Sequence, residues 1–187
     1  MRGRVWYDKC MYCTIEKVNY VLNKMRDTFR MACGPRRRGD WLRQNGINNP
    51  DWIYSLSADD VINQRVPSHV AGPFARAKLF CKYAKDEKLD CVVLITPNCD
   101  DIIALGEKSS GTVFGYALIA VKIDGVLRAF DPAHRPLDFI PGNICVGSRV
   151  QCVLTWYSCP ITAIVPRDDF ANVQCYDDFL KLYTSKR

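Results

Sequence analysis

The sequence predicts an α+β fold, in which N-terminal helices and one buried central helix pack on an antiparallel sheet. Two observations predict it. Apolar residues recur at helical spacing in the first half of the chain, and short apolar segments bounded by turn residues fill the second half. The 187 residues, 48% of them hydrophobic, suit a single domain with a basic helical part (1–50), a helix-plus-sheet core (66–166) and a closing helix (176–185).

The first predicted helix covers residues 14–32. Its apolar residues lie three or four positions apart and form one stripe, made by Ile15, Val18, Leu22, Met25 and Phe29. Gly34-Pro35 ends this helix, and loops are expected at 34–43 and 43–51. A short helix should then cover 58–64, because Ser57 followed by Asp60 matches a capping box.

The buried central helix is expected to start at 71–73 and to end near Lys88. Its apolar residues again follow helical spacing, at Phe74, Ala77, Cys81 and Ala84. Pro73 suits the first turn of a helix, because the N–H group that proline lacks would have no intrahelical partner there.

Strands follow the central helix. The apolar segment 90–96 predicts a first strand, and a polar loop at 98–112 separates it from a hairpin of 113–122 and 126–130. Asp124-Gly125 is the hairpin turn, since Asp-Gly favours the backbone twist of a two-residue turn. Further strands are predicted at 149–156 and 161–165.

Two motifs carry a resemblance to a known superfamily. The first is the helix-opening segment Val70-Ala-Gly-Pro-Phe-Ala-Arg-Ala-Lys-Leu-Phe80, and the second is the hairpin from Gly115 to Pro132. Over residues 66–135 the chain resembles the papain-like fold superfamily, in particular its transglutaminase-like, C39-peptidase-like and arylamine-acetyltransferase-like groups. In these families a nucleophilic cysteine begins the central helix, a histidine lies on the first hairpin strand, and an aspartate after the second strand orients that histidine.

The resemblance puts Ala71 at the nucleophile position, Tyr116 at the histidine position and Asp131 at the acid position. A transglutaminase-style alignment would put Pro73 at the nucleophile position instead, and neither alignment gives a cysteine. Alanine has no nucleophile, and the phenol of tyrosine titrates near about 10, too high for a base near neutral pH. The resemblance therefore implies a catalytically degenerate protein that binds a protein or peptide in the former active-site cleft.

An active cysteine protease, deamidase or transglutaminase is the alternative. It requires either that Ala71 replaces a natural cysteine, or that His69 or His134 activates another thiol, such as Cys81 or Cys99. The ten cysteines give no second close pair to complete a zinc site with Cys10-x-x-Cys13, so neither a metal nor a cofactor is expected.

Positive charge is concentrated near the N-terminus. Residues 1–50 hold 11 Lys or Arg and 4 Asp or Glu, whereas residues 51–187 hold 15 and 16. Arg36, Arg37 and Arg38 could bind an acidic surface or nucleic acid. A nucleic-acid-binding protein is therefore a second alternative, because aromatic residues that could stack on bases are interleaved with the basic ones: Trp6, Tyr7, Tyr12, Tyr20, Trp41 and Trp52.

No apolar run approaches the roughly 20 residues that cross a bilayer, so no membrane span is expected. No secretory signal is visible either, which predicts a cytoplasmic location. A compact domain of this kind would also suit an effector delivered into a host cell.

Overall fold

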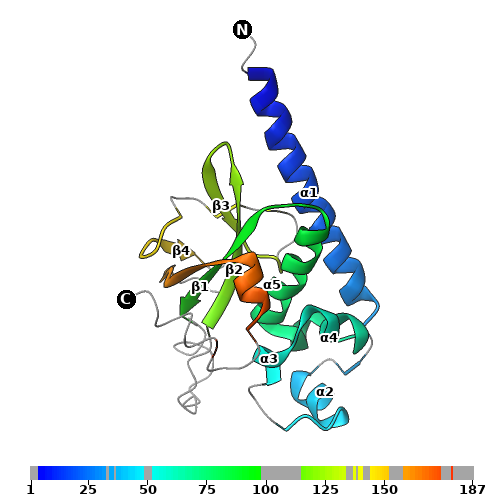
Figure 1. The fold of residues 1–187 in the computed structure, drawn as a ribbon. Coiled ribbons are helices and arrows are strands. Elements are labelled where there is room, and N and C mark those ends of the chain that lie inside the picture. The colour runs from blue at the N-terminus through cyan, green and yellow to red at the C-terminus, as the bar shows by residue number, and fades with distance from the viewer. Residues whose placement is uncertain are drawn as a thin grey trace.

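The computed structural model describes residues 4–32, 34–35, 37–48, 52–97, 115–133, 137, 139–140, 144–151, 158–173 and 178. Five helices come first: α1 (Arg4–Arg30), α2 (Arg38–Gln44), α3 (Trp52–Ser55), α4 (Ala58–Asn63) and α5 (Ser68–Asp86). The strands follow, as β1 (Cys91–Pro97), β2 (Gly115–Ile123), β3 (Val126–Phe130), β4 (Arg149–Gln151), β5 (Ser158–Pro160) and β6 (Ala163–Pro166), with α7 (Arg167–Ala171) after them (Figure 1). The predicted α+β class is confirmed.

The main sheet has the strand order β3-β2-β1-β6, and each neighbouring pair is antiparallel. Its hairpin turns at Asp124 and Gly125, whose φ angles of 51° and 82° are both positive, as the predicted Asp-Gly turn requires. Strands β4 and β5 pair in a separate two-stranded sheet. Antiparallel pairing of β2 with β3 thus follows from a short, correctly predicted turn.

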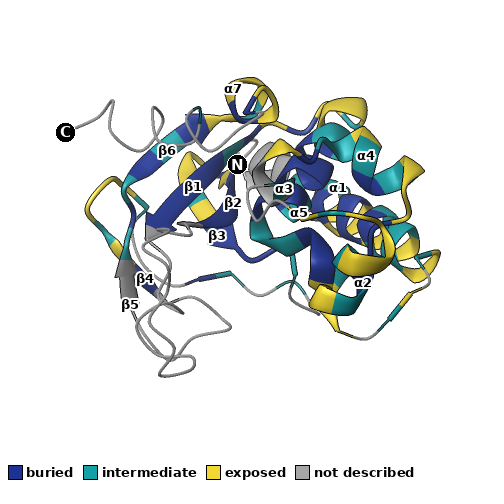
Figure 2. Cartoon of the chain, turned by 90° about the horizontal axis from the view of Figure 1, so that it is seen from below, coloured by how far each residue is buried: buried dark blue, intermediate teal, exposed yellow. Residues whose placement is uncertain are grey.

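Each face of the main sheet has its own apolar layer, because successive side chains of a strand point to opposite faces. Val93, Ile119 and Phe130 belong to the larger cluster, which includes the inner residues of α5 and α1. Leu94 and Leu118 belong to the smaller cluster, together with Val150 of β4. Figure 2 shows buried residues along the strands and on the inner sides of α5 and α1.

The helices differ from the prediction in their extent. Helix α1 starts at Arg4, before the predicted residue 14. Helix α2 occupies most of the predicted loop at 34–43, because Trp41 is buried there and its ring lies 5.5 Å from that of Trp52 in α3. Helix α3, strand β5 and helix α7 were not predicted; each has only three to five residues, too few to establish a period.

Helix α5 starts at Ser68, before the predicted residues 71–73, and contains a kink at Gly72. Gly72 has φ 71° and ψ 177°, a backbone conformation that is accessible almost only to glycine. The regular part of the helix therefore begins at Pro73, where the missing N–H group leaves no hydrogen bond unmade. The predicted role of Pro73 is confirmed, and one further turn precedes it.

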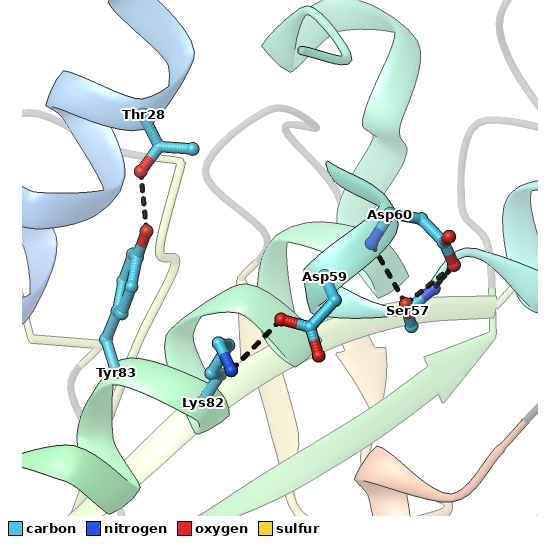
Figure 3. A network of polar contacts seen from close by, with 6 residues as sticks. All are labelled: Thr28, Ser57, Asp59, Asp60, Lys82 and Tyr83. Carbon is cyan, nitrogen blue, oxygen red and sulfur yellow. Dashed lines mark hydrogen bonds and ion pairs between the residues drawn. The ribbon is translucent and has the colours of Figure 1, made fainter. Parts of the chain in front are cut away.

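Polar contacts join the neighbouring helices to α5 (Figure 3). The hydroxyl oxygens of Thr28 and Tyr83 lie 2.7 Å apart and connect α1 to α5. Lys82 forms a 3.1 Å ion pair with Asp59 of α4. The capping box predicted for α4 is also present, since the Asp60 N–H donates to Ser57 Oγ and the Ser57 N–H donates to Asp60 Oδ2.

Some predicted elements lie outside the described residues. These are the loop at 98–112, the part of the 149–156 strand after Gln151, and the closing helix at 176–185 apart from Asp178, which is helical. The strand predicted at 161–165 is present as β6, which starts two residues later. No helix in the described ranges combines the length and the hydropathy needed to cross a membrane.

Candidate functional site

Asp131 lies immediately after β3, and its side chain is buried. The Tyr116 hydroxyl donates a hydrogen bond of 2.5 Å to Asp131 Oδ2. The backbone N–H of Ala133 donates one of 2.8 Å to Asp131 Oδ1. Both carboxyl oxygens therefore have a protein donor, and the structure brings together two of the three residues that sequence analysis identified.

Tyr116 lies near the start of β2 and packs in the smaller apolar cluster, on the face of the sheet opposite α5. Its cross-strand partner on β1 is Thr96, which is fully buried. Among the described residues, Thr96 Oγ1 is one of two buried side-chain polar atoms without a hydrogen-bond partner. The sequence could not single out Thr96, because threonine is common in strands and its pairing depends on the strand register.

Ala71, the third predicted residue, is fully buried in the larger cluster, between the sheet and the helices. It directly precedes the Gly72 kink, so it lies in the turn before the regular part of α5. Pro73, the alternative nucleophile position, is half-buried at the start of that regular part. The structure thus places Ala71 and Tyr116 in separate apolar clusters.

The end of β3 and the residues after it nevertheless reach α5. The Phe130 ring packs edge-on against Phe80 of α5, with 5.4 Å between ring centroids. Pro132 and Ala133 line a hollow together with Ser68 at the start of α5. We refer to residues 130–133, with Tyr116, as the Asp131 corner; it connects the sheet to α5.

The hollow beside the Asp131 corner, here called the α1–α5 hollow, has a volume of about 50 Å³. Met25 and Phe29 of α1 form an apolar part of its lining. Its charged lining residues are Arg26 of α1 and Arg76 of α5. Sequence analysis missed both arginines, because neither lies in a basic run and only the packing of α1 on α5 brings them to one hollow.

Cys81 and His69, the two described residues of the active-enzyme alternative, each have another partner. Cys81 is buried inside α5, and both a hydrogen bond with Cys91 and burial raise the pKa of its thiol well above the ordinary value. His69 lies with Nε2 3.2 Å from the carbonyl oxygen of Pro35. His134 and Cys99 lie outside the described residues.

A second hollow, of about 200 Å³, lies between α4, α5 and α7 and is lined in part by Lys78 and Cys81. The Lys78 ammonium group donates to the carbonyl oxygens of Leu56 and Val173. Burial lowers the pKa of Lys78 from 10.5 to about 8, although Asp60 and Asp178 oppose the shift. Lys78 thus connects the segment before α4 and the segment after α7 to α5.

The lowered pKa of Lys78 predicts a pH-dependent stability. Above the folded-state pKa of about 8, the unfolded chain binds a proton that the folded chain has released, so stability rises with pH. The free energy of unfolding of the wild type, measured by urea denaturation relative to Lys78→Met, should therefore increase by about 2 kcal/mol from pH 7 to about pH 9.5. A difference between the two proteins that stays constant over this interval would contradict the assignment.

The basic N-terminal residues are only partly available as a binding surface. Arg37 and Arg38 are exposed at the start of α2, and Arg36 lies outside the described residues. Trp41 is buried against Trp52, so its ring is unavailable for stacking on a base, whereas Tyr20 is exposed. The other three aromatic residues lie in the first part of α1, where the side chains are not described.

Within the described part of the chain, no group of three or more His, Cys, Asp or Glu side chains is arranged to hold a metal ion. Cys10 and Cys13 both lie in α1, where their side chains are not described. Comparison of the chain with protein-family models, with curated proteins and with solved structures finds no match.

Proposed function

We propose that this protein is a catalytically inactive relative of the papain-like cysteine acyl-transfer enzymes, and that it binds a protein or peptide partner at the Asp131 corner. The observation that carries the proposal is the hydrogen bond from Tyr116 to Asp131. In an active site of that superfamily, the acid orients an imidazole that accepts the proton of the thiol. A phenol, with a reference pKa near about 10, keeps its own proton near neutral pH and cannot take this role.

The nucleophile position supports the catalytic inactivity in this proposal. Ala71 carries no thiol and is fully buried. Cys81 cannot substitute for it, because its pKa is raised and the thiol, unlike the thiolate, is a poor nucleophile. Cys81 also lies well inside the helix, away from the N-terminal N–H groups that stabilise a thiolate.

Selection from a random peptide library on the immobilised full chain tests the proposal. We expect the wild type to enrich a peptide family, and Ala133→Trp to reduce affinity for it at least tenfold, because the indole is larger than the hollow beside Asp131 and would obstruct it. Lys122→Trp is the matched control, since Lys122 is exposed in the β2–β3 hairpin, and it should bind as the wild type does. Circular dichroism would verify that both variants fold.

Activity profiling with a thiol-directed acyl probe completes the test. We expect no cysteine of the wild type to react faster than a free thiol at about pH 6, where only a thiol of depressed pKa is ionised. Rapid labelling of one cysteine would overturn the proposal in favour of an active enzyme. Failure to enrich any peptide would overturn the binding function.

A further inference from the structure

The α1–α5 hollow has a marked charge imbalance. Arg26 and Arg76 both line it, and no acidic residue does so in the described part of the chain. Neighbouring cations on α1 do have acidic partners: Lys24 pairs with Glu87, and Arg30 pairs with Asp27. Neither Arg26 nor Arg76 takes part in any ion pair between described residues.

Arg76 also has an unmet hydrogen-bonding requirement. Its Nε atom is buried and, among the described residues, has no acceptor. A buried donor without a partner costs free energy, so native proteins rarely leave one in that state unless a ligand, an ion or water supplies the acceptor. The Arg76 side chain also lines the hollow, so an oxyanion bound there would lie beside its guanidinium group.

The lining indicates the chemistry of the ligand. Guanidinium groups present planar sets of N–H donors that match the two oxygens of a carboxylate. A cavity needs only about 10–15 Å³ to admit one water molecule, so about 50 Å³ accommodates one small oxyanionic group. The apolar wall formed by Met25 and Phe29 suits the methylene groups of an acidic side chain.

We propose that the α1–α5 hollow binds a side-chain carboxylate of an acidic peptide segment, with Arg26 and Arg76 as the two cationic contacts. This inference rests on the proposed peptide-binding function and adds the identity of one recognised group. The hollow shares Pro132 and Ala133 with the Asp131 corner, so a peptide at that corner would have its acidic residue within reach of both arginines.

The peptides enriched in the library selection test the inference. We expect them to carry Asp or Glu at one position, and replacement of that residue by Asn or Gln should weaken binding to the wild type at least tenfold. Arg76→Gln and, independently, Arg26→Gln should weaken binding of the acidic peptide by a similar factor. The Arg76→Gln variant should bind the neutral peptide no worse than the acidic one, because this variant has already lost the contact between the guanidinium group and the carboxylate.

Arg30→Gln is the matched control. Arg30 lies one turn after Arg26 on α1, is largely exposed and pairs with Asp27, so its substitution removes one positive charge without touching the hollow. Equal weakening by Arg30→Gln would overturn the inference in favour of general charge attraction. If the selected peptides carry no acidic residue and Arg76→Gln does not change their affinity, the inference is wrong but the peptide-binding function stands.

Two further outcomes concern the source of the oxyanion. If no peptide binds but inorganic phosphate raises the melting temperature of the wild type and not of Arg76→Gln, the site takes a free anion and the inference is wrong. If single-stranded RNA binds through Arg76 instead, the peptide assignment is wrong as well. Rapid labelling of a low-pKa thiol would refute the inactive-enzyme proposal separately, since it does not depend on either arginine.

Discussion

Replacing Gly72 with alanine is expected to lower the free energy of unfolding by about 2–3 kcal/mol. The cause is the backbone: at φ 71° and ψ 177° an L-residue with a Cβ atom is strained, whatever space surrounds it. Space is not the limit here, because a Cβ at Gly72 would meet no atom within 4 Å. Urea denaturation followed by circular dichroism measures the change.

Gly39→Ala is the matched control for Gly72→Ala. Gly39 lies in α2 with no positive φ, and a Cβ there also meets nothing within 4 Å. Alanine favours helix over glycine by up to about 1 kcal/mol, so this variant should be as stable as the wild type or slightly more stable. If the two substitutions changed the free energy of unfolding equally, the backbone conformation at Gly72 would not require glycine.

The Gly72 kink also marks the limit of what the sequence could predict about α5. The apolar spacing from Phe74 to Ala84 is periodic over several turns, and it correctly predicts the regular helix from Pro73 onward. The extra turn from Ser68 to Ala71 has no such signal, because it is too short to repeat a period. Its φ and ψ values depend on tertiary packing, which a local pattern does not encode.

The candidate site, too, is only partly predictable from the sequence. The resemblance puts Tyr116 and Asp131 at one site, on the two sides of an Asp-Gly hairpin, and the structure joins them by a hydrogen bond. Arg26 and Arg76 are 50 residues apart on different helices, and only the packing of α1 on α5 makes them neighbours of one hollow. Local rules predict hairpin contacts well and helix–helix contacts poorly.

Replacing Asp131 with alanine is expected to lower the free energy of unfolding by about 2–4 kcal/mol. The substitution removes the acceptor of two hydrogen bonds and leaves the Tyr116 hydroxyl and the Ala133 N–H without that partner. Tyr116 is nearly inaccessible, so water does not readily replace the lost acceptor. The loss should also displace residues 130–133 and weaken peptide binding at the neighbouring hollow.

Asp131→Asn separates the shape of the side chain from its hydrogen bonds. The asparagine oxygen can accept from the Ala133 N–H, while its amide group can donate to the Tyr116 oxygen, so both contacts persist in weaker form. We therefore expect a loss of about 1 kcal/mol for this variant, and a binding affinity close to that of the wild type. If Asp131→Ala and Asp131→Asn were equally stable, the corner would not depend on these two hydrogen bonds. If instead Asp131→Asn keeps stability but loses binding, binding depends on the negative charge of the buried Asp131 side chain and not only on the shape of the corner.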